Sequence, residues 1–464
     1  MARTSQIPKE KLTALLQLWG PVSATDLAAA LKVTRGKVVR TLKDFDRRLV
    51  VLGAARSTRY ALRRTIRSLG DRWPVYRIDG QGRAESLAVM EALYERRWRM
   101  TWAGQPPAWS GHFSDRDGFF EGYPFFLSDI RPQGFLGRIM AGRVSRHLDL
   151  PANPQTWSDD QTQIFLLSQG VDLPGSVVMG DDCLRQALEQ AVFPDNSTLV
   201  PEAEVARRYP ALAAEIMTVL PGSSAGGEHP KFLTRLQSST GESRSVLVKF
   251  SPPMDQPAGR RWADLLRCEY HAQLILEAQD LALPGARTLD SGGLRFLEVP
   301  RFDRTAAGGR RGVVSLEALH DAAVGSGQGT WPEAVAELVE CGLTGADALD
   351  TAERLHAFGG LIGNTDMHRG NLAFWLDDTL PFRVAPAYDM QPMFTAPGPQ
   401  GGIVDRPFTP PVPLAANHGA WLEAAGWAVA FWRTVVDDPE ISAPFRAAAV
   451  GFLDTVERMR RHWT

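Results

Sequence analysis

The sequence predicts an α+β protein in three parts: a small basic head, a mixed or β-rich middle region, and a two-lobed body whose second lobe is helical. Charge is the first observation, because residues 1–70 carry 15 Lys and Arg against four Asp and Glu. Their net charge of +11 leaves −13 for the other 394 residues. Short β-like runs fill the middle, and a hairpin followed by long helical patterns fills the rest. A basic head on an acidic body favours a nucleic-acid-binding module joined to a second function.

Composition excludes several classes of protein. The chain has 464 residues, of which 44% are apolar, as in ordinary globular proteins. No apolar run approaches the ~18 residues of a membrane span, and the first residues lack the apolar core of a secretion signal. The cysteines, Cys183, Cys268 and Cys341, form neither a disulfide framework nor a metal-binding pair. We therefore expect a cytoplasmic protein with no membrane partner.

The head, residues 1–70, shows three helical patterns and a hairpin. The first apolar stripe consists of Leu12, Leu15, Leu16 and Trp19. Ser23 and Thr34 occupy the positions that cap the second and third helices. Two β-rich runs follow at 49–52 and 59–62. This order resembles a winged helix-turn-helix, whose third helix enters the major groove of DNA.

Basic side chains of the head are placed to contact double-stranded DNA. At the start of the third helix, the residues expected to face the bases are Thr34, Arg35, Lys37 and Arg40. On and after the hairpin, the residues expected to meet phosphates are Arg56, Arg59, Arg63, Arg64 and Arg67. The alternative is a small three-helix domain with a solvated basic face. The charge excess and the hairpin favour DNA binding.

The middle region is rich in aromatic residues and glycine and carries no catalytic constellation. His112 and His147 are isolated, and lone histidines are more often structural than catalytic. We expect this region to be scaffold. The expected domains are 1–70, 71–200 and 201–464, the last divided into an N-lobe, 201–303, and a helical C-lobe, 304–464.

A glycine-rich loop, 221–231, opens the informative part of the body. Its small residues are Ser223, Ser224, Ala225, Gly226 and Gly227. Such a loop can bring backbone N–H groups close to nucleotide phosphates, although most Gly-Ser clusters are simple turns. Two alternating runs, 231–237 and 243–250, then predict a hairpin. Lys249 ends the second strand, where a lysine is unusual unless a partner fixes it.

Glu269 is the predicted partner of Lys249. The stretch 260–280 is helical, and its apolar face comprises Trp262, Leu265, Leu266 and Leu276. Glu269 falls on the same face, where an unpaired carboxylate is costly. In protein kinases a strand lysine holds nucleotide phosphates and pairs with a helix glutamate. The alternative is that Glu269 lies at the edge of the stripe, in water.

A polar loop, 363–371, follows a helical pattern and precedes a β-hairpin. Phosphoryl transfer to a hydroxyl needs one carboxylate to accept the proton, and an amide oxygen and a second carboxylate to hold Mg²⁺. Asp366, Asn371 and Asp389 fit these roles in this order. Each residue also has a simpler interpretation: a turn for Asp389, a metal ligand for His368, and core packing for Tyr388 and Phe302.

The segment 360–371, together with Tyr388-Asp389, resembles the HipA family of Ser/Thr toxin kinases, which is similar to protein kinases and phosphatidylinositol kinases. Its loop has Asp before His, unlike the His-Arg-Asp order of ordinary protein kinases. The resemblance runs from residue 120 onward and includes the Ser-Ser-Ala-Gly-Gly loop, Lys249, Cys268-Glu269-Tyr270 and Pro300-Arg301-Phe302-Asp303-Arg304. With its basic head, the chain is similar to the HipH (YjjJ) branch. The resemblance implies a two-lobed, protein-kinase-like body.

The resemblance implies a role for each matching residue. Asp366 is the implied general base, Lys249 contacts the ATP phosphates, and Glu269 positions Lys249. The implied Mg²⁺ ligands are Asn371 and Asp389. The other implied ATP contacts are Ala225, Gly226, Gly227, the backbone of Arg301 and Phe302 at the adenine, His368 and Tyr388. Ser223, or its neighbour Ser224, matches the serine whose autophosphorylation switches the family's kinases off.

The resemblance implies an ATP- and Mg²⁺-dependent Ser/Thr protein kinase of toxin type, with a substrate in translation such as an aminoacyl-tRNA synthetase. The head would bind the gene's own operator, and whether a separate antitoxin exists stays open. Pro300 departs from the glutamate that the family often has, which puts a side-chain contact to the nucleotide in doubt. Two alternatives stay open: a small-molecule or lipid kinase, and a DNA-binding regulator whose body only senses nucleotide.

Overall fold

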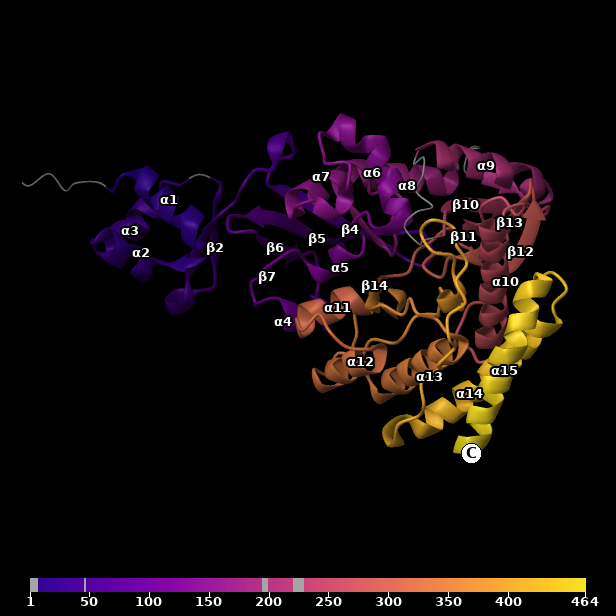
Figure 1. The fold of residues 1–464 in the computed structure, drawn as a ribbon. Helices are drawn as coiled ribbons and strands as arrows, with labels where there is room; N and C mark the ends of the chain where they lie inside the picture. Colours follow the sequence, from indigo (N-terminus) through magenta and orange to yellow (C-terminus); the bar gives the residue numbers. More distant parts are fainter. Residues whose placement is uncertain (1–6, 46, 194–198, 220–228) are drawn as a thin grey trace, which may run out of the picture.

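The computed structural model describes residues 7–45, 47–193, 199–219 and 229–464. The head lies at one end of the molecule, the middle region in the centre and the body at the other end (Figure 1). Helices and strands are both abundant and occur largely in separate runs, in agreement with the predicted α+β class. In the described part of the chain, no helix combines the length and the apolar character that a membrane span requires.

The head packs three helices against an antiparallel sheet of order β1-β3-β2. Its elements are α1 (Lys9–Trp19), β1 (Val22–Ser23), α2 (Ala24–Leu31), α3 (Arg35–Leu42), β2 (Leu49–Leu52) and β3 (Arg59–Leu62). The hairpin strands have the predicted bounds, and β1 is an additional strand. The side chain of Ser23 accepts the N–H of Asp26 at 3.1 Å and caps α2 as predicted. Thr34 precedes α3 without a side-chain capping bond, and Trp19, predicted for the core, is 41% exposed at the end of α1.

The middle region is a larger sheet than the short runs in the sequence indicate. Its strands, in the order β7-β6-β5-β4-β8, are β4 (Arg72–Ile78), β5 (Ala84–Leu93), β6 (Arg97–Trp102), β7 (Phe119–Phe120) and β8 (Val177–Met179). Its helices are α4 (Ser110–Phe113), α5 (Phe125–Ser128), α6 (Gly134–Leu148), α7 (Asp159–Gln169) and α8 (Asp181–Val192). Trp73, Trp98 and Trp109 lie in the core that the sheet shares with these helices.

The N-lobe is a five-stranded sheet of order β12-β13-β11-β10-β9, flanked by two helices. Its elements are β9 (Leu199–Pro201), α9 (Val205–Val219), β10 (Lys231–Gln237), β11 (Ser243–Phe250), α10 (Pro257–Glu277), β12 (Arg287–Ser291) and β13 (Leu294–Pro300). The hairpin β10–β11 has the predicted bounds and pairs Lys231 with Lys249 at its open end. Alternation of buried and exposed side chains along β10 explains why the sequence predicts this strand so closely.

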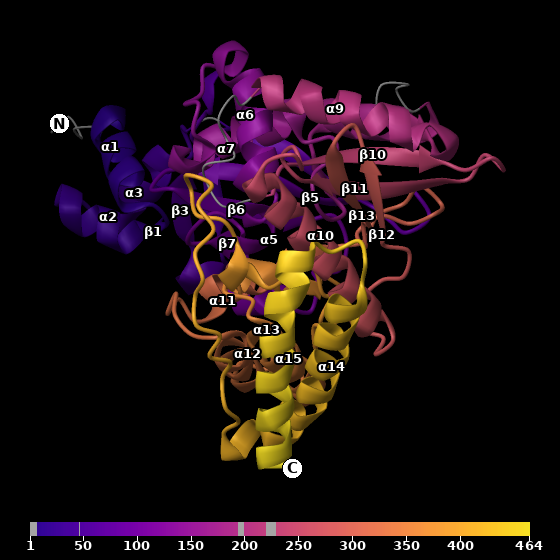
Figure 2. The ribbon, with the colours of Figure 1, turned by 45° about the vertical axis from the view of Figure 1, so that its right-hand side comes forward.

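The C-lobe is mainly helical, as predicted. Its elements are β14 (Val313–Ser315), α11 (Leu316–Ala323), α12 (Trp331–Glu340), α13 (Ala346–Ile362), β15 (Ala373–Trp375), α14 (His418–Asp437) and α15 (Ala443–Trp463). α14 packs against both α13 and α15, and Figure 2 shows α14 and α15 side by side. The short strand β15 pairs with β14, and both lie beside the predicted polar loop.

Two arginines predicted to meet DNA phosphates bind the middle region. The Arg59 guanidinium lies 2.6 Å from the carboxylate of Asp115. Arg63 Nε lies 2.7 Å from Glu91 Oε1, and the side chain of Glu91 is only 2% exposed. Asp115 pairs with Arg59, whereas Glu91 is shared by Arg63, Arg72 and Arg99. Arg59 and Arg63 therefore help to dock the head on the middle region, and the predicted phosphate contact of Arg59, whose side chain is 41% exposed, stays a prediction.

Arg64 and Arg67 also contact the middle region. Arg64 pairs with Asp160 and lies 4.9 Å from the ring centre of Trp98, while Arg67 donates to the carbonyl oxygens of Leu148 and Asp149 at 2.6 and 2.8 Å. Apolar side chains also cross the junction, and the shared cluster consists of Val50, Leu52, Ala61, Leu93 and Phe119. The head is therefore docked on the middle region by both packing and ion pairs.

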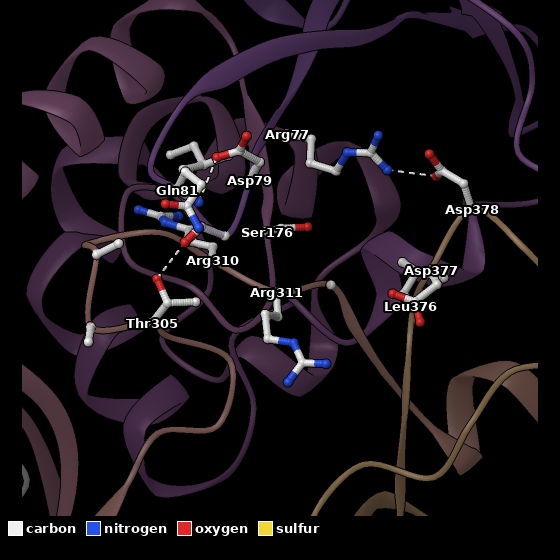
Figure 3. A pocket seen from close by; sticks show the side chains of 15 residues that line it. Arg77, Asp79, Gln81, Ser176, Thr305, Arg310, Arg311, Leu376, Asp377 and Asp378 are labelled. Atoms are coloured by element: carbon white, nitrogen blue, oxygen red, sulfur yellow. Dashed lines mark hydrogen bonds and ion pairs between the residues drawn. The ribbon is translucent and has the colours of Figure 1, made fainter.

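The middle region also packs against the C-lobe. Arg77 of β4 lies 2.6 Å from Asp378, and the indole N–H of Trp109 donates to the carbonyl of Asp377 at 3.1 Å. Figure 3 shows Arg77 and Asp378 directed toward one another beside a cavity of about 660 Å³ between the two regions. Asp377 and Asp378 form the turn between the polar loop and Asp389. The middle region thus braces the segment that joins two predicted Mg²⁺ ligands.

Candidate active site

The predicted Lys249–Glu269 pair is present in the N-lobe. Lys249 lies next to last in β11 and is 3% exposed, and its Nζ lies 2.6 Å from Glu269 Oε1 on α10. The same ammonium group contacts Asp389 Oδ1 from the segment after β15. Glu269 is 4% exposed, so the alternative of a solvated Glu269 at the stripe edge is excluded. Three residues far apart in the sequence therefore meet at one point between the lobes.

The charges of this cluster are fixed by their neighbours. Burial alone would lower the pKa of Lys249, but Asp389 and Glu269 raise it. Burial alone would raise the pKa of Asp389, but Lys249 holds it well below its usual range. For Glu269 burial is the largest effect, and it raises the pKa against the opposing influence of Lys249. Lys249 is therefore protonated and Asp389 ionised at neutral pH.

Asp389 has an unusual backbone conformation that a second residue supports. Its φ is +56°, in the left-handed region that non-glycine residues rarely adopt. The amide of Asn364, which is 4% exposed, donates to the carbonyl of Asp389 at 3.1 Å. The Asn364 Oδ1 accepts the backbone N–H of Asp366 at 3.1 Å. Asn364 thus ties the two predicted carboxylates together, a role that its position in the motif does not reveal from the sequence alone.

The polar loop also brings Asp366 and Asn371 together. The Asn371 amide donates to the carbonyl of Asp366 at 2.8 Å, which leaves Asn371 Oδ1 as the atom suited to a metal. The side chain of Asp366 is exposed, whereas Asn371 is 8% exposed. The loop therefore presents one accessible carboxylate and one buried amide, as the proposed division between base and ligand requires.

Aromatic side chains form the floor beside the loop. Tyr388 stacks on Phe302 with ring centres 5.7 Å apart, and its hydroxyl donates to the carbonyl of Gly370 at 2.7 Å. His368 is exposed, and its Nδ1 accepts the backbone N–H of Gly370 at 3.1 Å. Among the described residues, no three His, Cys, Asp or Glu side chains gather as a metal site, which disfavours the alternative of His368 as a metal ligand.

The predicted adenine contact through the backbone N–H of Arg301 competes with a hydrogen bond inside the protein. This N–H already donates to the carbonyl of Ser245 at 3.0 Å, and the Arg301 guanidinium binds Asp172 and Asp303. A backbone N–H contact from Arg301 to adenine would require the bond to Ser245 to break. The Arg301 side chain belongs to an ion-pair network between the end of the N-lobe and the middle region, and the adenine contact of the Arg301 and Phe302 backbone stays a prediction.

Most of the glycine-rich loop lies outside the described residues, and with it the predicted positions Ser223, Ser224, Ala225, Gly226 and Gly227. The side chain of Arg56 also lies outside the described part. The last residues of the loop, from 229 on, are described: His229 is 5% exposed and its Nε2 lies 2.9 Å from Gln391 Oε1. Burial, assisted by Lys249, lowers the pKa of His229 to about 3. Nothing in the sequence marks this contact between the loop and the segment of Asp389.

The candidate DNA-reading residues remain accessible. Thr34, Arg35 and Arg40 are exposed and Lys37 is half-buried on α3. Within the described residues, Arg35, Lys37 and Arg40 form no ion pair. This surface differs from the hairpin side of the head, whose arginines are paired.

Comparison with known proteins finds matches over nearly the whole chain. Residues 69–188 match the YjjJ-like toxin middle domain, and residues 223–463 match the HipA-like C-terminal domain. The chain is 36% identical to Toxin YjjJ of Escherichia coli (strain K12) over 443 residues, which cover 95% of each chain.

A solved structure shares the fold at low sequence identity. The Shewanella oneidensis MR-1 HipA of a toxin–antitoxin complex with HipB and operator DNA matches with a TM-score of 0.50 at 14% identity. The match covers 82% of this chain and 97% of the other. The sequence matches cover most of the middle region and of the two-lobed body, and the solved structure shares the fold over 82% of this chain. The chain therefore belongs to the family of YjjJ-like toxins with a HipA-like C-terminal domain.

Proposed function

We propose that this protein is an ATP- and Mg²⁺-dependent Ser/Thr protein kinase of the HipA toxin type with a DNA-binding head. One observation carries the proposal: the buried ammonium of Lys249 contacts both Glu269 and Asp389, beside a loop that presents Asp366. A lysine held by a helix glutamate and a carboxylate after the catalytic loop are the parts that position a nucleotide for phosphoryl transfer.

The donor set fits Mg²⁺. Asp389 is an ionised carboxylate that retains 28% of its side-chain exposure, and Asn371 contributes an amide oxygen. Mg²⁺ prefers such hard oxygen ligands and commonly takes one or two from the protein and the rest from phosphates and water. When bound, the ion would neutralise charge on the phosphates. Lys249 would turn toward the phosphates as Asp389 turns toward the metal.

Asp366 is proposed as the base that accepts the hydroxyl proton. Its exposed carboxylate can reach a protein substrate, while Asn364 and Asn371 fix its backbone from both sides. Tyr388 and Phe302 would pack against the nucleotide, with His368 at the rim. The proposal includes autophosphorylation at Ser223 or Ser224. It also includes a substrate in translation, such as an aminoacyl-tRNA synthetase.

The head is proposed to bind operator DNA through α3. The related Shewanella HipA was solved with HipB and operator DNA, which supports DNA and an antitoxin as partners of this family. Arg35, Lys37 and Arg40, which form no ion pair with any described residue, are proposed to face the bases in the major groove.

The proposal is tested by separating nucleotide binding from transfer. Asp366→Asn should bind Mg²⁺·ATP as wild type and lose most of the transfer rate, because general-base catalysis contributes about 10²–10⁴-fold. Asp389→Asn should lose Mg²⁺-dependent ATP affinity. The matched control is Asp454→Asn, an exposed residue of α15. Unchanged transfer in Asp366→Asn, measured as ADP formation and protein phosphate, would contradict the proposal.

A further inference from the structure

A buried histidine outside the proposed catalytic residues contacts the catalytic loop. His320 lies on α11 and is 0% exposed, and both ring nitrogens have partners. We propose that His320 is a positioning residue, which holds Arg369 and through it the loop between Asp366 and Asn371. This inference rests on the proposed kinase function.

Arg369 is the anchor of the loop. Its Nη1 donates to His320 Nδ1 at 2.7 Å and to Asp321 Oδ1 at 2.8 Å. The Arg369 side chain is 11% exposed, whereas Asp321 is 50% exposed. The buried bond to His320 is therefore shielded from water, and the ion pair to Asp321 is not. Because solvent weakens exposed ion pairs, His320 is the stronger of the two anchors.

The chemistry of arginine determines the proton position on His320. Arginine only donates hydrogen bonds, so His320 Nδ1 must accept and the ring proton must lie on Nε2. Nε2 lies 2.5 Å from Glu337 Oε2 of α12, which is the acceptor that this tautomer needs. Arg369 of the loop thus donates to His320, and His320 donates to Glu337 of α12, in one chain of hydrogen bonds.

A second contact from α12 reaches the same loop. The indole N–H of Trp331, a side chain 1% exposed, donates to the carbonyl of His368 at 2.9 Å. His368 and Arg369 are consecutive, so α12 holds one directly and the other through His320. Burial of a histidine ring costs free energy unless both ring nitrogens have hydrogen-bond partners. Here one of these partners, Arg369, belongs to the loop that carries the proposed base.

Two substitutions of His320 separate positioning from packing. His320→Asn can keep an acceptor near Nδ1 for Arg369, whereas His320→Gln can keep a donor near Nε2 for Glu337. If His320 acts by holding Arg369, the asparagine variant should keep more transfer activity than the glutamine variant. His320→Ala should lower kcat about 10²-fold, the scale of a small misplacement of catalytic groups, with an ATP dissociation constant near wild type.

The experiment measures kcat, KM for ATP and thermal unfolding for these variants and for Arg369→Ala. The control is His271→Asn, which breaks a different buried histidine contact, to Asp438. We expect it to lower stability without the selective loss of kcat. The double variant His320→Ala with Arg369→Ala should be no slower than Arg369→Ala alone, because both remove the same anchor.

Nitrogen-15 NMR of histidine-labelled protein supplies a readout besides activity. The His320 signal, assigned by its absence in His320→Gln, should report a neutral ring with the proton on Nε2. A proton on Nδ1, equal activities of the asparagine and glutamine variants, or additive losses in the double variant would each overturn the inference. If wild type transfers no phosphate while the NMR signal is as expected, the proposed function fails although the anchor exists. Glu337→Gln serves as a milder variant if His320→Ala does not fold.

Discussion

The head and the body lie at the two ends of the molecule (Figure 1), and their charged side chains are placed in opposite ways. In the body, Lys249 is 3% exposed and meets two carboxylates from distant segments. On α3 of the head, Arg35 and Arg40 are exposed and form no ion pair with any described residue. In the proposed function, the buried charge serves a small ligand, the nucleotide, and the exposed charges serve a large polyanion, DNA.

The head itself shows the same contrast on a smaller scale. Its hairpin-side arginines contact the middle region, while those of α3 do not. A count of charges in the sequence predicts the excess of basic residues in the head, but it does not predict which of these residues form ion pairs. Pairing depends on acidic residues that only the fold brings near, such as Glu91 for Arg63 and Asp160 for Arg64.

The largest expected effect is at the buried cation. Lys249→Met leaves the carboxylates of Glu269 and Asp389 without their partner, and breaking such a buried pair costs about 3 kcal/mol of stability or more. Transfer should be lost as well. Lys11→Met, at an exposed position of α1, is the control. An unchanged unfolding midpoint in Lys249→Met would contradict the buried network.

The next effect tests the paired arginines of the head. Arg63→Ala should lower the free energy of unfolding by about 2 kcal/mol, because Glu91 loses a buried charge-assisted hydrogen bond. Arg72, which also contacts Glu91 but is 53% exposed, is the matched control, and Arg72→Ala should cost under about 1 kcal/mol. DNA affinity should stay at the wild-type value in both. If Arg63→Ala instead loses DNA affinity at unchanged stability, the result would support the predicted phosphate contact of Arg63.

The unpaired arginines of α3 should behave in the opposite way. Arg35→Ala and Arg40→Ala should each weaken DNA binding about tenfold, at the low end of 1–3 kcal/mol per contact, and leave stability unchanged. If either arginine neutralises a phosphate instead of a base edge, its variant should also reduce the slope of log affinity against log salt by about 0.9. Fluorescence anisotropy with a duplex at several salt concentrations measures both. If both variants bind DNA with wild-type affinity and wild-type salt dependence, the DNA-binding surface does not include α3.

The smallest effect is a pH dependence in the body. The pKa of His229 is about 3 in the folded protein because burial disfavours its charged form, whereas the unfolded chain takes up a proton near pH 6.5. Stability is therefore lost as pH falls below 6.5, by about 1 kcal/mol per unit. His229→Gln, which can still donate to Gln391, should lose about 1 kcal/mol less than wild type between pH 7.5 and 5.5. Equal losses in denaturant titrations would argue against a buried neutral His229.

Local sequence patterns predict much of this molecule, and long-range contacts explain what they miss. Alternation and turn residues predict two hairpins to the residue, and the cost of a buried carboxylate predicts the Lys249–Glu269 pair. The hairpin predicted after the polar loop is wrong in its main pairing, because β15 pairs with β14 and meets its predicted partner segment only at the bridge between Phe374 and Val384. Asn364, His229 and His320 act through partners that no periodic pattern marks. Asn364 ties two loops together, and His320 acts from a helix 49 residues before Arg369. Trp19 shows the converse, since a residue in register with a stripe is exposed where the helix ends.

The central claim is that this site transfers phosphate to protein. Its most direct test is mass spectrometry of the intact protein and its peptides after incubation with Mg²⁺ and ATP, with Asp366→Asn beside wild type. The account predicts phosphate on a serine of the 222–231 loop in wild type and none in the variant. Wild-type protein that binds ATP but stays free of phosphate, alone and with candidate protein substrates, would contradict it. That result would leave a small-molecule kinase or a nucleotide-sensing regulator.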